Sequence, residues 1–163
     1  MNALKTTKLA MLVSASLLAV AQPVLALTEV REVEVEIDMS SIKNSEAAKV
    51  WSNAAADLQN AIVARVADRA AEDGVRVNVD IDEIALSNAY ERALGVGETK
   101  LSGRVNVSSE TDNTKFATYD LMVGFDKAYV PAGTDVAVLT MDSPQYYEAM
   151  VNMFADHVVA KLN

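Results

Sequence analysis

Residues 44–73 read NSEAAKVWSNAAADLQNAIVARVADRAAED, and this stretch decides the fold class. Apolar side chains recur along it at helical spacing, at Ala47, Trp51, Ala54, Leu58, Ile62 and Val66. Ten of its thirty residues are alanine, the strongest helix former, and several of them lie off the apolar stripe. We therefore predict one long helix that follows an N-cap at Asn44, ends at Gly74, and offers its alanine side to a second helix.

Segments of alternating apolar and polar residues lie on both sides of this helix. Residues 30–39 (VREVEVEIDM) place their apolar side chains on one parity and four acids on the other. The same period-two pattern recurs at 75–81, 101–107 and 116–125, and it is typical of strands with one buried and one solvent-facing side. After Asp82 and Glu83 the apolar residues resume on the other parity, which predicts a β-bulge.

The last segment has a well-formed helix start, with Ser143 as the N-cap and Pro144 at the first helical position. Its apolar stripe comprises Tyr147, Met150, Val151, Phe154, Val158 and Leu162. Together these elements predict an α+β domain. We expect an antiparallel-rich sheet of four or five strands, the fifth at 136–139, with the long helix and the C-terminal helix packed on one face.

The first 26 residues have the pattern of an export signal. Lys5 and Lys8 precede an apolar run at 9–20 that is shorter than the ~20 residues a membrane-spanning helix needs. Small residues place the cleavage site after Ala26, with Ala21 as the alternative. We expect residues 27–163 to form a single periplasmic domain that makes no stable membrane insertion once the signal is cleaved.

Composition narrows the possible partners. The chain has no cysteine, which excludes disulfides, thiolate metal sites and a lipid-modified cysteine behind the signal peptide. Loss of Lys5 and Lys8 with the signal changes the formal net charge from -9 to -11. So acidic a chain is poorly suited to phosphate backbones or anionic membranes, and we expect no nucleic-acid partner. Solubility alone also accounts for this charge.

No motif predicts a cofactor or a metal. Asn78, Asp80 and Asp82 have the spacing of a calcium loop, but Glu83 stands where that loop needs glycine. The glycine pair at 95–97 lacks the third glycine of a dinucleotide-binding turn. We therefore assign no catalytic, cofactor-binding or metal-ligating residue.

Catalysis is not expected either. The only histidine, His157, has no triad partner in sight, and we place it at the partly buried boundary of the last helix. The best carboxylates for acid–base work are Glu83 at the bulge and Asp120, and the sequence offers neither of them a partner. We expect the protein not to be an enzyme.

Four apolar residues lie where a contact surface could form. Phe116 and Met122 fall on the otherwise polar side of the fourth strand, and exposed apolar pairs are a pointer to interaction sites. Tyr90 and Leu94 belong to the long irregular segment 87–100. We name these four as the possible contact surface.

Two passages carry a resemblance to a known class of domains. AIVARV at 61–66 leads through Gly74 into VNVDI at 77–81, and GVGETKLSGRVNV occupies 95–107. In these passages the chain resembles small bacterial cell-envelope domains of strand–helix–strands–helix plan, among them uncharacterised lipoprotein families and the accessory lipoprotein of the lipopolysaccharide-transport pore. The chain departs from them in lacking the lipidated cysteine, so no functional residue is carried over.

Two hypotheses for function follow. The first is a non-catalytic periplasmic module that acts through contact with another envelope protein. The alternative is a carrier of a small apolar or amphiphilic ligand held between helices and sheet. The residues that suggest the carrier are Met39, Trp51, Tyr119, Tyr146, Met150, Met153 and Phe154, although their spacing already places them in a core. The sequence leaves the oligomeric state open.

Overall fold

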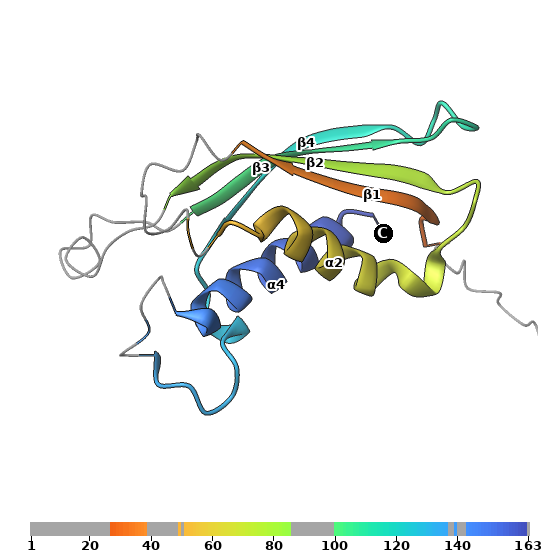
Figure 1. The fold of residues 1–163 in the computed structure, drawn as a ribbon. Helices are drawn as coiled ribbons and strands as arrows, with labels where there is room; N and C mark the ends of the chain where they lie inside the picture. Colours follow the sequence, from red (N-terminus) through yellow and green to blue (C-terminus); the bar gives the residue numbers. More distant parts are fainter. Residues whose placement is uncertain are drawn as a thin grey trace, which may run out of the picture.

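The computed structural model describes residues 27–38, 49, 51–85, 100–136, 139 and 143–162, and its fold is α+β as predicted. A four-stranded sheet has two helices packed against one of its faces, while no described helix lies on the other (Figure 1). The predicted export signal at 1–26 lies outside the described residues.

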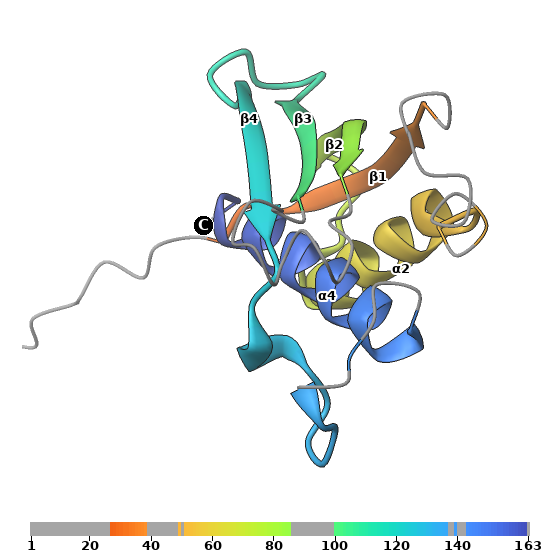
Figure 2. The ribbon, with the colours of Figure 1, turned by 90° about the vertical axis from the view of Figure 1, so that its left-hand side faces the viewer.

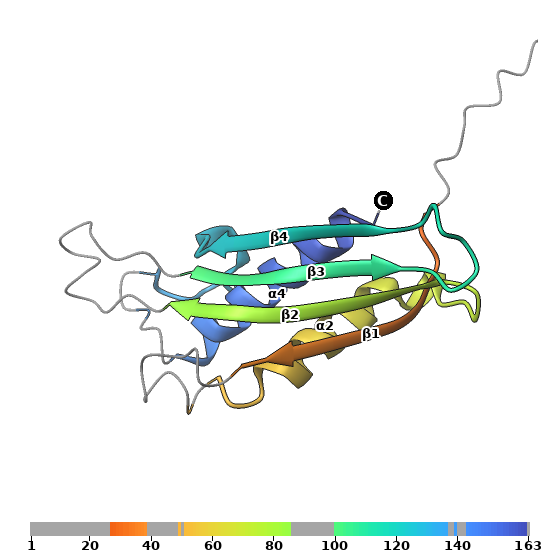
Figure 3. The same cartoon turned by 90° about the horizontal axis from the view of Figure 1, so that it is seen from above.

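The strands lie in the sheet in the order of the sequence (Figure 3). They are β1 (Val30–Ile37), β2 (Val75–Ala85), β3 (Lys100–Ser108) and β4 (Ala117–Gly124). β1 pairs with β2 in parallel, and the other two pairings are antiparallel, so the antiparallel-rich prediction is confirmed. Parallel neighbours need a crossover connection, and here the crossover contains α2 (Ala54–Val66).

The predicted alternation sets the register of all four strands. Val35, Val79, Val105 and Tyr119 form one row across the face toward the helices, and Glu34, Asn78, Asn106 and Thr118 form the next row on the opposite face. A one-residue slip in any strand would exchange its two faces, so the apolar pattern fixes the pairing. The register shifts between Ile81 and Glu83, which confirms the predicted bulge.

The sheet has four strands in the part of the chain that the structure describes. Val136 and Leu139, the ends of the predicted fifth strand, lie in no strand, and 137–138 are outside the described residues.

The long helix is shorter than predicted. Trp51–Asn53 form a turn, α2 begins at Ala54, and a 3₁₀ turn, η2 (Ala67–Arg69), follows Val66. Lys49 is helical, and 44–48 lie outside the described residues. At the C-terminal end Ala70 is extended and bridges to Val30 of β1, whose carbonyl accepts a hydrogen bond from the Ala71 amide at 3.1 Å. This pairing overrides the helix propensity of the alanines.

Gly74 has a different role from the predicted helix stop. Its φ is not positive, and a Cβ built there would lie 2.7 Å from the backbone of Val30 and Arg31. Its neighbour Val75 donates its amide proton to the Glu29 carbonyl at 2.8 Å. Glycine is needed because the start of β1 crosses directly over this backbone.

The C-terminal helix α4 (Pro144–Ala160) begins as predicted. The Ser143 hydroxyl accepts a hydrogen bond from the Tyr146 amide at 3.3 Å, and Pro144 occupies the first turn. Most of the predicted stripe is buried. His157, expected to be partly buried, is instead exposed, and its Nδ1 lies 2.8 Å from the Met153 carbonyl oxygen.

The two helices pack side by side under the sheet (Figure 2). The Arg65 guanidinium of α2 forms an ion pair with Asp156 of α4, and it also donates to Asn152 Oδ1 at 3.0 Å and to the Ala61 carbonyl at 2.8 Å. Ala55 and Ala61 are partly buried against the core.

The face assignment of α2 gives a direct prediction. Leu58 has no exposed surface and Asn60 is exposed. Leu58→Asp buries an unpaired charge and should lower the free energy of unfolding by on the order of 4 kcal/mol or more, enough to unfold the domain. Asn60→Asp should stay within about 0.5 kcal/mol of the parent protein in urea unfolding. Equal losses from the two substitutions would show that the buried face is misassigned.

Candidate functional site: the open face of the sheet

The sheet face that the helices leave uncovered is polar and mainly acidic. Its outward positions are exposed or partly exposed on all four strands, and the acidic row predicted for β1 does face solvent. The exposed side chains on this face are Glu32, Glu34, Glu36, Asn78, Asp80, Asp82, Glu83, Arg104, Thr118, Asp120 and Met122. We call this set, together with Ser102 and Asn106 between them, the open face.

Positive charge is concentrated where β1 and β2 begin. Arg76 Nε lies 2.7 Å from Glu32 Oε2, and Arg31 holds Glu110 of the β3–β4 turn through two bonds of 2.7 and 2.9 Å. The hydrogen bonds from Arg31 lower the pKa of the Glu110 carboxyl below its ordinary value. Exposed pairs of this kind contribute little to stability, so their main effect is to balance charge at this end.

The opposite end carries an excess of negative charge. Glu34, Glu36, Asp80 and Glu83 form no ion pair with any residue in the described part of the chain. Arg104 on this face is paired with Asp120 across β3 and β4, and Lys100 lies on the same side of β3 at its first residue. Anionic ligands and surfaces are therefore repelled from this half of the open face.

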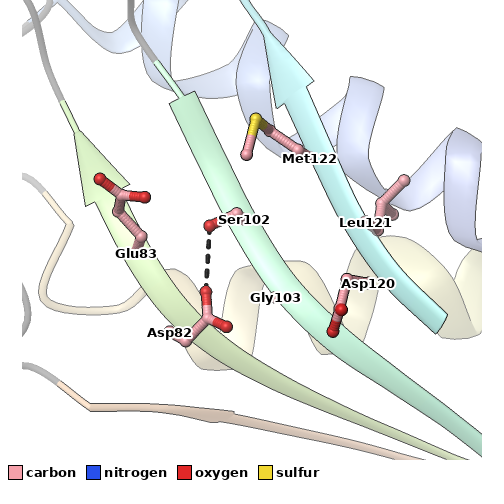
Figure 4. Close-up of a pocket in the computed structure, with 7 residues that line it drawn as sticks. All are labelled: Asp82, Glu83, Ser102, Gly103, Asp120, Leu121 and Met122. Atoms are coloured by element: carbon pink, nitrogen blue, oxygen red, sulfur yellow. Dashed lines mark hydrogen bonds between the residues drawn. The ribbon is translucent and has the colours of Figure 1, made fainter. Parts of the chain in front are cut away.

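The β-bulge shapes a depression on the open face. The extra residue turns both Asp82 and Glu83 outward, and Asp82 Oδ1 accepts a hydrogen bond from the Ser102 hydroxyl at 3.0 Å (Figure 4). Met122 continues the row of Glu83 and Ser102 onto β4. The resulting depression is open and has a volume of about 520 Å³. Its lining is Asp82, Glu83, Ser102, Gly103, Asp120, Leu121 and Met122.

A second hollow lies across β1, β2 and β3. It has a volume of about 230 Å³ and is lined mainly by polar side chains, those of Glu34, Glu36, Asn78, Asp80 and Asn106. Glu34 and Glu36 are two residues apart on β1, a spacing of ~6.6 Å, and Asp80 lies opposite Glu36 on β2. Within the described ranges no three acidic or histidine side chains gather closely enough to hold a metal ion.

The open face offers carboxylates, a hydroxyl and one guanidinium. Ser102 donates to a carboxylate, but an activated nucleophile needs a base that takes its proton and a third group to orient that base. Asp120, which the sequence left without a partner, pairs with Arg104 at 3.1 Å. Glu83 lines the same depression as Asp120. The structure thus places the two acid candidates at the same depression, on β2 and β4, and gives a counter-ion to Asp120 only.

The predicted contact residues are distributed unevenly. Met122 is 60% exposed at the depression, and Phe116 is 69% exposed just before β4 begins. Six residues of extended chain separate them by ~20 Å, so they do not form one patch. Tyr90 and Leu94 lie outside the described residues. Asp82 and Ser102 were missed because only the strand register places them beside Met122.

The layer between helices and sheet is a packed core. Trp51, Tyr146, Met150 and Phe154, named for the carrier hypothesis, have almost no exposed surface, and Met153 is 3% exposed. They belong to the same apolar cluster as the inward strand residues. Met39 lies outside the described residues. Packing therefore accounts for the described members of this set without a ligand.

Two tyrosines in this layer differ in how their hydroxyls are satisfied. The Tyr147 hydroxyl donates to Asp57 Oδ2 at 2.5 Å, and burial together with this bond raises its pKa. The ring of Tyr147 also meets Trp51 edge-on, with centroids 5.0 Å apart. The Tyr119 hydroxyl is buried without a hydrogen-bond partner among the described residues, and burial raises its pKa to about 12.

Comparison with known proteins gives resemblances in shape only. No protein-family model and no curated protein matches the chain. A DUF330-family protein from Xanthomonas campestris aligns at 10% identity with a TM-score of 0.48, over 83% of this chain and 84% of the other. A PelC dodecamer from Paraburkholderia phytofirmans aligns at 9% identity with a TM-score of 0.44, over 83% of this chain and 86% of the other. A candidate lipoprotein from Caulobacter crescentus aligns at 13% identity with a TM-score of 0.38, over 80% of this chain and 86% of the other. At TM-scores below 0.5 these alignments carry no conclusion about function.

The two tyrosines give a matched pair of predictions. Tyr147→Phe removes a hydrogen bond to a carboxylate and should lower the free energy of unfolding at pH 7 by about 1 kcal/mol, reduced by partial exposure. Tyr119→Phe removes a buried hydroxyl that lacks a partner and should be neutral or slightly stabilising. Urea unfolding measures both. A larger loss from Tyr119→Phe than from Tyr147→Phe would contradict the hydrogen-bond assignment.

The raised pKa values of the two tyrosines also predict that the fold loses stability at alkaline pH. A tyrosine whose folded pKa lies above its unfolded value of about 10 stabilises the fold fully below that pH, and this contribution is lost as the pH rises toward the folded pKa. Stability should therefore fall above about pH 10, and each phenylalanine variant should weaken that fall.

Gly103 gives a prediction for the depression. A Cβ there would lie 2.6 Å from the Asp80 carbonyl oxygen and 2.9 Å from Ile81 Cδ1, so β2 would have to move at the bulge. Gly103→Ala should lower the free energy of unfolding by about 1–3 kcal/mol. Ser102→Ala, one residue away and outward-facing, should change it by less than about 0.5 kcal/mol. Thermal unfolding of the two variants distinguishes close backbone approach from a general sensitivity of β3.

Proposed function

We propose that this chain is an exported, non-catalytic protein of the bacterial cell envelope that acts by binding another envelope protein through the open face. The observation that carries the proposal is the one-sided cover of the sheet. Both described helices pack on the apolar face, and the opposite face presents two depressions and an exposed methionine. The export signal predicted at 1–26 supports the location.

Three features favour a protein partner over other classes. The excess of carboxylates around the bulge disfavours the binding of nucleic acid and of anionic lipid. None of the helices in the described ranges has the length and apolar character to cross a bilayer. The depression at Met122 combines an apolar side chain with hydrogen-bonding groups, and a mixture of this kind is common in protein interfaces.

The test is a position-specific cross-link in living cells. A photo-reactive amino acid replaces Met122, and a control chain carries it at Asn60, which is exposed on α2 on the other side of the molecule. We expect irradiation to give a reproducible adduct with one envelope protein from position 122 and none from position 60. Equal adduct patterns at the two positions, or no adduct at position 122, would contradict the proposal.

A further inference from the structure

The two edges of the sheet differ in how well they are protected against pairing with another strand. β1 carries Glu32, Glu34 and Glu36 on its outward positions, so two β1 edges laid against each other would oppose carboxylate to carboxylate. The start of β1 is also occupied by its bridge to Ala70. The carboxylates and this bridge together protect the β1 edge against pairing with another strand.

Within the described residues, the β4 edge has fewer protections than the β1 edge, with Asp120 as its one charged side chain. The strand ATYDLMVG contains no proline and no lysine, and its pairing with β3 shows no register shift. No backbone hydrogen bond joins β4 to any described segment other than β3. Because an edge strand bonds on one side only, half of its amides and carbonyls point outward unpaired.

The sequence of β4 is complementary to itself in one antiparallel register. When Tyr119 lies opposite Tyr119 of a second copy, Phe116 faces Met122 of that copy and Thr118 faces its Asp120. Phe116, the residue before β4, and Met122 of β4 then cover each other twice, once on each side of the two-fold axis. On the inner face Ala117 lies opposite Leu121 of the second copy.

Neighbouring registers lose this match. Centring the pair on Asp120 opposes two like charges, and centring it on Leu121 sets Asp120 against Met122 of the second copy. Registers that pair odd with even positions would put the helix-covered face of one copy beside the open face of the other. The register centred on Tyr119 alone pairs Phe116 with Met122.

We propose that the β4 edge pairs with the β4 edge of a second copy of this chain, antiparallel and centred on Tyr119. The result is a two-fold dimer with one continuous eight-stranded sheet. Both helix layers lie on one side of it and both open faces on the other. The inference rests on the edge and its register, and it shares Met122 with the contact surface proposed above. A cross-link from position 122 to a second copy of this chain therefore supports the dimer, and a cross-link to another envelope protein supports the proposed function.

The test uses charges that report the register. In Phe116→Lys/Met122→Lys, each lysine faces a lysine of the second copy, and symmetry repeats the repulsion. In Phe116→Lys/Met122→Glu, each lysine faces a glutamate. Sedimentation equilibrium of the parent protein should show a mass that rises from one chain toward two with concentration. The double-lysine variant should dimerise at least about tenfold more weakly, and the lysine–glutamate variant should regain dimerisation.

A control and a second readout keep the result unambiguous. Val63→Lys, at an exposed apolar position on α2, should leave dimerisation unchanged, and circular dichroism should show all variants folded. The chain has no cysteine, so Thr118→Cys and Asp120→Cys can be mixed. The mixture should form a disulfide-linked dimer, while each variant alone should not, because like positions lie diagonally at ~8 Å. A monomer at every concentration, or equal dimerisation of the two charge variants, would overturn the proposal.

Discussion

Burial of one face of the sheet beneath two helices is the interaction on which the rest of the structure depends. The inward valines of β1, β2 and β3 and the stripe of α2 lose nearly all contact with water, as do the large side chains of α4. Burial of apolar surface is the main favourable contribution to folding, and here it comes from a single layer. It also forces the polar half of every strand to the opposite face, and so the open face is a direct consequence of how the core forms.

Much of this could be predicted because strand and helix periods are local properties of the sequence. The alternation around Val33 and Val77, the cap at Ser143 and the parity slip at Asp82 each correspond to a feature of the structure. The ends of α2 could not be predicted in this way. Ala70 leaves the helix because its backbone meets Val30, some forty residues earlier in the chain, and local propensity contains no term for that contact.

The candidate site was predicted less completely than the fold. The exposure of Phe116 and Met122 follows from the alternation of inward and outward positions along residues 116–125. The hydrogen bond between Asp82 and Ser102 and the ion pair between Arg104 and Asp120 depend on which residues lie opposite each other, and register is fixed only when the strands assemble. The oxygens of Asp82 reach Ser102 because a bulge re-aims them, and sequence indicates that a bulge exists without giving its partner.

The two ends of the open face differ in a way that bears on how a partner approaches. Around Arg31 and Arg76 the acids are matched by guanidinium groups, so that end is close to neutral. Around the bulge Asp82 and Glu83 stand side by side, and Arg104 on this face is already paired. Unpaired charges at an exposed sheet face lower the stability of the fold only slightly. Their field reaches about a Debye length into the solvent and acts on an approaching partner. The contact surface that we propose is therefore placed at the bulge, where a depression, an exposed methionine and an excess of carboxylates coincide. The ion-paired rows at the other end contribute charge balance.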